Sequence, residues 1–473
     1  MSEKPKSSQA SIAPRAEASS FNWAQWFAEY GMLLVLGLLC VGMCLTTISE
    51  THPNGSSAGT EFADDIIQKH GADKQVLVVA GVTKEDKGFV EALAARLKES
   101  DVEIVAALNG FPGDARKILS DLQSQDKKVD LIACNSTSQT WSVWKVMRRE
   151  SPQIGTMEVV SPESYYWPSF LSAGNVLGII DNATIFAIIG IGMTMVIITG
   201  GIDLSVGSLL ALAAVISTMM IRDLAGGADA GGLGVFVCCV TAIAVCGLLG
   251  ALSGGIVLTF NTRPYVVPPF IMTLSMMLIA RGLAYIISGN QTIAGPDLPA
   301  SFNWLGAGTT FGPVRNPIVL MFVLYIVAHV MMSRTTVGRY IYAVGGNTEA
   351  ARLSGVPVKR VLLWVYTGCG LLAGLGGVVL ASRLSSGSAT YGNTYELFII
   401  AAVVVGGTSL SGGEGKVFGT LIGALIIAVV QSGLNQQGVS GRKQELVLGV
   451  IILAAVLLDM LGKRAVQKRR SKT

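Results

Sequence analysis

From about residue 170 onward the chain is a succession of apolar runs, each close to the length that a helix needs to cross a bilayer. These runs lie at about residues 176–199, 203–221, 233–258, 266–288, 317–333, 361–381, 396–410, 417–434 and 445–461. Another run comes earlier, at residues 30–48. Together they predict an α-helical polytopic membrane protein with about ten transmembrane helices.

The composition agrees with a chain that has lipid as its main solvent. Hydrophobic residues make up 51% of it and charged residues 14%, which is roughly half the charged share of a typical soluble domain. Membrane lipid is therefore the first partner that we expect.

Residues 49–168 differ in character, because charges are spread throughout and the apolar bursts are short. Strands are predicted at residues 75–80, 102–108, 129–133 and 156–160, and helices at 88–100, 114–122 and 141–148. Strands that alternate with helices predict a parallel sheet covered on both faces. We expect a soluble α/β domain inserted between two membrane spans.

The domain order follows from these segments. We predict an N-terminal tail at 1–29, a first transmembrane helix at 30–48, the α/β domain at 49–168, a transmembrane domain at 169–461 and a basic tail at 462–473. Lys and Arg gather in the tails and in the loop around residues 334–360, which predicts that both termini are cytoplasmic and that the α/β domain is periplasmic. Nucleic-acid binding by the basic tail is not expected, since no basic face interleaved with aromatic residues occurs elsewhere.

A polar turn, Gly200 to Ser208, interrupts two apolar runs and contains Asp203 and Ser205. An ionisable residue at such a place is costly unless it faces a cavity or caps a helix. One interpretation is that Asp203 and Ser205 satisfy backbone N–H groups where a helix restarts. The other is that the broken helix lines a solute path, and the two are compatible.

The predicted cytoplasmic loop carries a short helix-forming stretch from Glu349 to Leu353, and Gly355 supplies a stop. A helix in this position could transmit force from a motor subunit, although a solvated connector is an equally simple interpretation. The candidate coupling residues are Gly345, Gly346, Asn347, Glu349, Ala350, Ala351, Arg352, Leu353, Ser354 and Gly355.

The segment from Arg383 to Glu396 joins two apolar runs through small polar residues. Asn393 and Glu396 offer hydrogen bonds of the sort that a hydroxylated solute accepts. An ordinary periplasmic loop would have a similar composition and is an equally good interpretation. The candidate solute pathway is Asp203, Ser205, Asn393 and Glu396.

Chemistry on the chain itself is not predicted. The segment from Gly412 to Lys416 resembles a phosphate-binding loop, but its glycines do not have the spacing of the G-x-x-x-x-G-K-[ST] motif. Val417 also stands where that motif requires Ser or Thr. The cysteines and histidines show no metal-ligand spacing. We therefore expect no catalytic residue, no cofactor, no metal and no enzymatic activity, and any ATP hydrolysis must come from a partner.

Four ordered motifs resemble those of the ribose and related monosaccharide permeases of the ABC importer superfamily. They are GMTMVIITGGIDLSVGSLLAL at 192–212, PPFIMTLSMMLIARGLA at 268–284, VGRYIYAVGGNTEAARLSGVPV at 337–358 and AAVVVGGTSLSGGEGKVFGTLIGALI at 401–426. The resemblance implies cytoplasmic ABC ATPase subunits, a periplasmic solute-binding protein and a second permease copy in a homodimer. It also implies that the segment around Asn347 to Gly355 is the coupling helix, and that the chain lies in the cell inner membrane.

The chain departs from this pattern at two places. Phe398 stands where the family usually has an acidic residue, which leaves nucleosides or other small polar solutes of the same superfamily open as alternatives. The 49–168 domain is extra, and through residues 87–136 it resembles one lobe of a periplasmic sugar-binding protein. A membrane receptor with this domain as a sensor is the remaining alternative, but the tail after Met460 is too short for an output domain.

Overall fold

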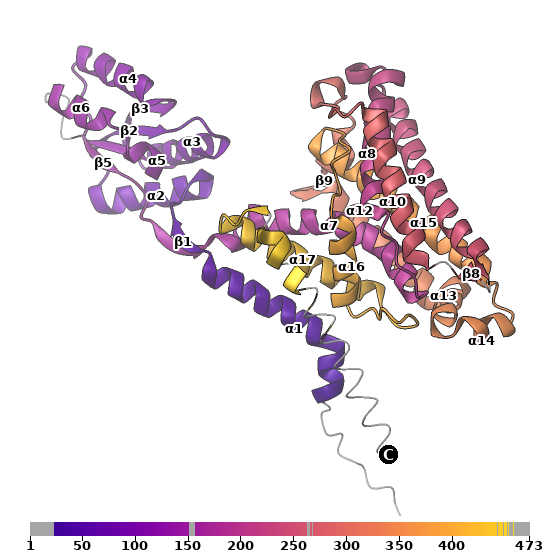
Figure 1. Ribbon diagram of the computed structural model, residues 1–473. Coiled ribbons are helices and arrows are strands. Elements are labelled where there is room, and N and C mark those ends of the chain that lie inside the picture. The colour runs from indigo at the N-terminus through magenta and orange to yellow at the C-terminus, as the bar shows by residue number, and fades with distance from the viewer. Residues whose placement is uncertain are drawn as a thin grey trace, which may run out of the picture. The chain divides into compact units, whose positions relative to one another are not determined.

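The computed structural model describes residues 23–150, 157–262, 265–266, 268–441, 443–447, 449–451, 453 and 457. The chain forms two compact units (Figure 1). Cys44–Leu171 is one, here called the inserted domain, and Met1–Met43 together with Ser172–Thr473 is the other, here called the membrane unit.

The inserted domain contains the expected parallel sheet. Its strands are β2 (Gln75–Ala80), β3 (Glu103–Asn109), β4 (Leu131–Cys134) and β5 (Glu158–Val160). They lie in the order β3-β2-β4-β5, and all neighbours are parallel. The order reverses direction between β2 and β4, as in other doubly wound sheets.

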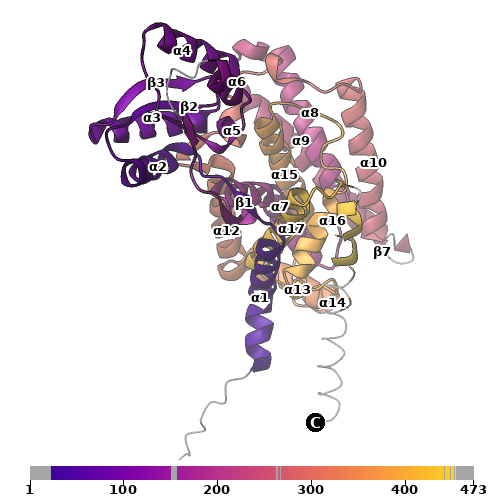
Figure 2. The same ribbon diagram turned by 90° about the vertical axis from the view of Figure 1, so that its left-hand side faces the viewer.

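Helices cover both faces of this sheet (Figure 2). On one side lie α2 (Gly55–His70) and α3 (Lys84–Glu99), and on the other lie α4 (Pro112–Ser124) and α6 (Val143–Glu150), with the short α5 (Ser136–Gln139) following β4. Alternate residues of β2 enter the two cores, because successive side chains of a strand point to opposite faces. Helix α2 was not predicted from the sequence, because its buried face consists mainly of small residues, with Phe62 and Ile66 as its large apolar side chains.

A two-stranded antiparallel ribbon closes the domain. Strand β1 (Ile48–Thr51) pairs with β6 (Tyr165–Pro168), so the segments that enter and leave the domain run side by side. The 3₁₀ turn η2 (Ser169–Leu171) follows, and the backbone N–H of Ser169 donates to the Thr47 carbonyl at 3.0 Å.

A buried carboxylate holds together the carboxyl ends of β2 and β4. Asp86 Oδ1 accepts hydrogen bonds from the side-chain amides of Asn54 at 2.8 Å and Asn135 at 2.7 Å, and its Oδ2 accepts one from the backbone N–H of Thr83 at 3.1 Å. Burial raises the pKa of Asp86, but these hydrogen bonds outweigh it and leave the pKa below its usual value.

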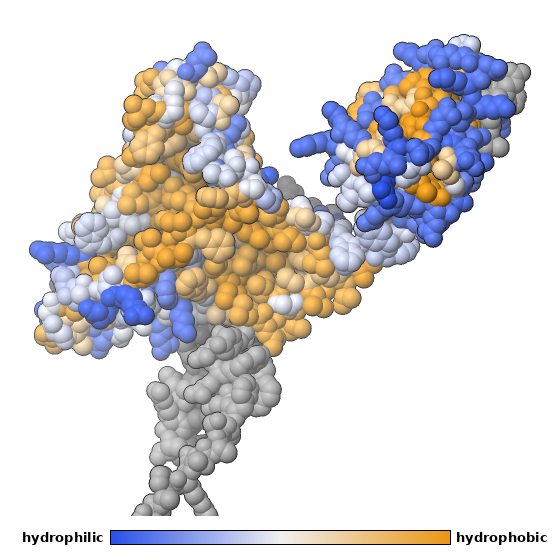
Figure 3. All heavy atoms as spheres, turned by 180° about the vertical axis from the view of Figure 1, so that it is seen from behind, coloured by the Kyte–Doolittle hydropathy of each residue, from blue (hydrophilic) through white to orange (hydrophobic). Residues whose placement is uncertain are grey.

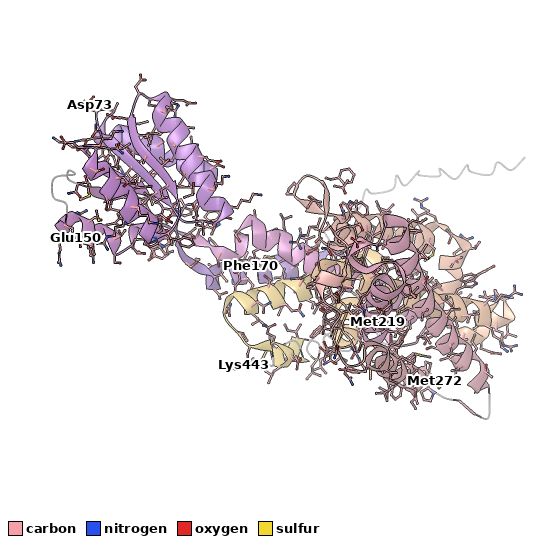
Figure 4. The ribbon with its side chains drawn as sticks, turned by 90° about the horizontal axis from the view of Figure 1, so that it is seen from above. Asp73, Glu150, Phe170, Met219, Met272 and Lys443 are labelled. Atoms are coloured by element: carbon pink, nitrogen blue, oxygen red, sulfur yellow. The ribbon has the colours of Figure 1, made fainter. Side chains whose placement is uncertain are left out.

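Asp86→Ala should destabilise the inserted domain by roughly 2–3 kcal/mol, because it leaves the two buried amides without their charged acceptor. In the wild type the same stabilisation should be complete above the usual Asp pKa of about 3.9 and should disappear as the pH falls through the lower folded value. Hydrogen exchange of the α3 amides in the full chain measures both effects. The control is Asp73→Ala, at the exposed edge of the domain in Figure 4, and equal protection in the two variants would contradict the assignment.

Seven helices in the described part of the membrane unit are long and apolar enough to cross a membrane. They are α7 (Ala173–Ile198), α8 (Val206–Leu224), α9 (Gly232–Phe260), α10 (Pro269–Ser288), α12 (Asn316–Arg334), α15 (Val358–Leu384) and α17 (Val417–Gln436). The multi-pass helical architecture is thereby confirmed. Apolar side chains dominate the visible surface of this unit (Figure 3).

The other three predicted spans have different outcomes. The first is α1 (Trp23–Thr46), whose described apolar part begins at Gly31. The span predicted at 396–410 is wrong in length, because α16 (Tyr395–Val405) stops after 11 residues, where Gly406 and the left-handed Gly407 leave the helix. The run at 445–461 lies partly outside the described residues.

Short elements connect the long helices. They are η3 (Gly227–Asp229), β7 (Asn261–Thr262), β8 (Tyr265–Val266), η4 (Gly295–Asp297), α11 (Asn303–Gly306), β9 (Thr309–Phe311), β10 (Val314–Arg315), α13 (Thr336–Gly346) and α14 (Thr348–Leu353).

Glycines let α15 approach its neighbours closely. A side chain at Gly370 would meet the backbone carbonyl of Cys246 on α9, and one at Gly377 would meet that of Leu210 on α8. In lipid such close backbone contact replaces the hydrophobic driving force that water provides elsewhere.

An ion cluster joins α7 to β10 and α15. The carboxylate of Asp181, only 6% exposed, accepts from Arg315 at 2.8 Å and from Arg383 at 3.3 Å. A buried charge is tolerated when paired in this way.

Candidate solute pathway and coupling loop

The helix break between α7 and α8 is organised by one carboxylate. Gly200, in a left-handed conformation with φ of 81°, ends α7, and Asp203 follows, fully buried. Asp203 Oδ1 accepts the backbone N–H of Ser205 at 2.9 Å and its hydroxyl at 2.6 Å. The capping interpretation is thus confirmed for Asp203 and wrong for Ser205, whose hydroxyl serves Asp203 instead of the first turn of α8.

Several buried polar atoms around this break lack a hydrogen-bond partner among the described residues. They are Asp203 Oδ2, Ser208 Oγ and the hydroxyl of Tyr366. The Tyr366 hydroxyl lies against Gly201, and the thiol of Cys369 lies beside the Asp203 carboxylate. Buried polar atoms without a hydrogen-bond partner cost free energy. We therefore expect water or another polar molecule to form the missing hydrogen bonds here.

The chain leaves α15 through an irregular segment, residues 385–394, that follows α8 inward. Ser385 adopts a left-handed conformation and ends the helix. Gly387 then lies against Ala214 and Thr218 of α8, and Gly392 lies against Gly207 near the first turn of α8. Non-helical backbone at this depth is tolerated only where protein or a polar cavity surrounds it.

At the end of this segment the first turns of α8 and α16 meet around Glu396. Its Oε2 is buried against Gly207 without a hydrogen-bond partner among the described residues. A carboxylate is favourable where two helix N-termini converge. Arg281 of α10 supplies an opposite charge within electrostatic range and donates to the carbonyls of Ala389 at 2.6 Å and Tyr391 at 2.7 Å.

The four predicted pathway residues therefore do not all share one environment. Asp203 and Ser205 precede the first turn of α8, and Glu396 contacts that turn. Asn393 is instead exposed. Sequence reasoning missed Arg281, Tyr366 and Cys369, which enter the site from α10 and α15, although a lone arginine within an apolar run was a usable signal.

Phe398 stands where the family motif usually has an acidic residue. Its side chain is buried. Its ring lies 6.0 Å from that of Phe186 and 6.3 Å from that of Tyr395. Phe398 thus contributes to an aromatic cluster between α7 and α16.

The predicted coupling segment contains the expected short helix, α14. Asn347 caps it by accepting the Ala350 N–H at 2.9 Å, and Gly355, with φ of 83°, ends it. Leu353 is 74% exposed, and Arg352 and Glu349 form an exposed ion pair at 3.0 Å.

The base of the coupling segment reaches the helix break. Gly345 packs directly against the carbonyl of Ile198, the last residue of α7. The apparent phosphate loop at 412–416 lies there too, since the Gly413 N–H donates to the Ile198 carbonyl at 2.9 Å and the Tyr342 hydroxyl donates to the Gly415 carbonyl at 2.7 Å. Sequence reasoning gave these residues no role.

A bundle of membrane-crossing helices with interrupted segments, and with buried polar atoms that have no partner among the described residues, is typical of membrane transport proteins. The chain belongs to the family described as branched-chain amino acid transport system / permease component, whose model matches residues 175–456. The inserted domain lies outside that match.

Named relatives fall in the same class. The ribose import permease protein RbsC of Escherichia coli (strain K12) is 41% identical over 276 residues, which cover 57% of this chain and 81% of the relative. RbsC of Bacillus subtilis (strain 168) is 42% identical over 278 residues, 59% and 82% of the two chains. The fructose import permease protein FrcC of Rhizobium meliloti is 37% identical over 261 residues, 54% and 69%. No solved structure matches the chain.

Gly207→Ala should lower the thermal stability of the membrane unit, because the added methyl group would meet the Glu396 carboxylate and the Gly392 carbonyl. Overpacking of this kind costs about 1–3 kcal/mol. Gly255→Ala on α9, where the methyl group meets nothing, is the matched control. Equal melting temperatures for the two variants in detergent would argue against close packing at Gly207.

Proposed function

We propose that the chain is the permease subunit of an ATP-driven importer that moves a ribose-like monosaccharide across the inner membrane. The observation that carries the proposal is that oxygens of Asp203, Ser208, Tyr366 and Glu396, which lie in or against the segment 201–208, are buried without a hydrogen-bond partner among the described residues. Hydroxyl-rich solutes need such donors and acceptors. The names of the relatives favour a sugar as that solute.

The partners follow from the family. The importer needs cytoplasmic ABC ATPase subunits, a periplasmic solute-binding protein and a second permease copy, a homodimer in the simplest case. The chain acts without covalent chemistry of its own. Both termini are placed in the cytoplasm and the inserted domain in the periplasm, in accord with the excess of Lys and Arg in the loop around residues 334–360.

Transport proceeds by alternating access in this proposal. ATP-driven closure of the ATPase subunits moves α14, and α13 carries the movement through Gly345 to Ile198 at the end of α7. The turn after Ile198 contains Asp203, so the same displacement alters the buried polar site. The direct contact between Gly345 and Ile198 supports this path.

The inserted domain is proposed as a docking or sensing module that assists solute delivery. Periplasmic sugar-binding proteins hold the sugar between two lobes, whereas this domain corresponds to one lobe. The residues at the edge where β2 and β4 end favour this role. The Asp86 carboxylate accepts hydrogen bonds from the amides of both Asn54 and Asn135, so these polar groups already bond to one another within the domain.

Solute identity is tested by uptake into proteoliposomes that contain the permease, its ATPase subunits and its binding protein. We expect ATP-dependent uptake of radiolabelled ribose or a related monosaccharide. Uptake of nucleosides with no uptake of sugars would support the alternative solute class, and absence of ATP-dependent uptake of any small polar solute would contradict the importer.

Arg352→Glu should abolish this uptake while leaving membrane insertion intact, because it reverses a charge on the exposed face of α14 and puts two acids side by side with Glu349. The control is Lys98→Glu, an equal charge reversal on an exposed position of α3. Normal uptake by the Arg352 variant would exclude α14 as the coupling helix.

A further inference from the structure

The antiparallel ribbon of the inserted domain exposes an unusual number of aromatic side chains. Tyr165 is 49% exposed, Tyr166 75% and Trp167 48%, and Ile48 on the other strand is 49% exposed. Tyr and Trp are the residues that gather at membrane–water boundaries, because each combines a large apolar ring with a polar group.

The two faces of the ribbon differ in charge. Tyr165 and Trp167 share one face, where their rings meet edge to face at 6.5 Å, and their cross-strand partners are the uncharged Thr51 and Ser49. The opposite face carries Tyr166 beside Glu50. Only the Tyr165–Trp167 face is free of charge.

Covalent continuity places this ribbon next to the bilayer. Strand β1 begins two residues after α1 ends at Thr46, and β6 ends five residues before α7 begins at Ala173. Leu45, shortly before β1, and Leu171, shortly after β6, are also exposed. A ribbon that is tied at one end to the apolar helix α1 and at the other to the membrane-crossing helix α7 cannot move far from the lipid surface.

The geometry points to a lipid-binding face: Tyr165 and Trp167, with Thr51 and Ser49 opposite them on β1, lie in the interfacial region of the phospholipid bilayer from which the inserted domain emerges. The rings enter the boundary between headgroups and acyl chains, while Glu50 on the other face stays in water. The ribbon thereby restricts the orientation of the inserted domain. This inference does not depend on which solute is transported.

Spin labels at Ser49→Cys and Glu50→Cys test the assignment on neighbouring positions that leave all the aromatic side chains in place. The background is the full chain with its seven cysteines replaced by serine, reconstituted in phosphatidylcholine vesicles. Oxygen concentrates in lipid and a nickel chelate stays in water, so the ratio of their collision rates reports depth. We expect a severalfold higher ratio at position 49 than at position 50.

Combining the label at 49 with Tyr165→Ala and Trp167→Ala should lower its ratio to that of position 50, whereas Tyr166→Ala should leave it unchanged. Equal, water-like ratios at 49 and 50 would overturn the proposal. Low accessibility to both reagents would also overturn it, since it would mean that protein, such as a second copy, covers the ribbon.

An independent measurement avoids the cysteine-free background. Lipids brominated near the headgroup should quench part of the tryptophan fluorescence of the wild-type chain, and Trp167→Phe should remove part of that quenching. An unchanged quenched fraction in this variant would likewise overturn the proposal.

Discussion

The close approach of backbone at Gly207 determines the arrangement of the membrane unit around its polar centre. Because residue 207 has no side chain, the carbonyl of Gly392 and the carboxylate of Glu396 can lie against the first turn of α8. This contact lets the irregular segment 385–394 run inward along α8 and lets α16 begin inside the unit. Without this contact, neither the first turn of α16 nor the Glu396 carboxylate could reach the first turn of α8.

The polar centre and the segment from α13 to α14 are connected through the end of α7. Ile198 offers one carbonyl that contacts Gly345 and accepts the Gly413 N–H, and five residues later Asp203 organises the start of α8. A shift of α13 and α14 cannot leave the turn at 200–205 undisturbed when the contacts are this close. In the proposed function, that turn is where the action of the ATPase subunits reaches the solute.

Local sequence rules predicted the features that depend on local contacts. Asn347 and Gly355 define α14 by capping and by a left-handed stop, and the alternation of strands and helices predicted the parallel sheet. Asp203 was recognisable because a carboxylate between apolar runs needs an explanation. What the sequence could not reveal is which distant side chains complete the site, since Tyr366 and Cys369 lie more than 160 residues away. Helix α16 was overestimated because apolar residues continue to its end, while Gly406 and Gly407 break it.

The most direct test of the account is ATP-dependent ribose uptake by Glu396→Gln in proteoliposomes with the ATPase subunits and the binding protein. Glu50→Gln on the ribbon is the matched control, and folding is checked by melting temperature. The account predicts uptake reduced by about tenfold or more, because the amide lacks the charge at the meeting helix ends and cannot replace both acceptor oxygens. Uptake equal to that of the wild type would contradict the assignment of the solute pathway to this site.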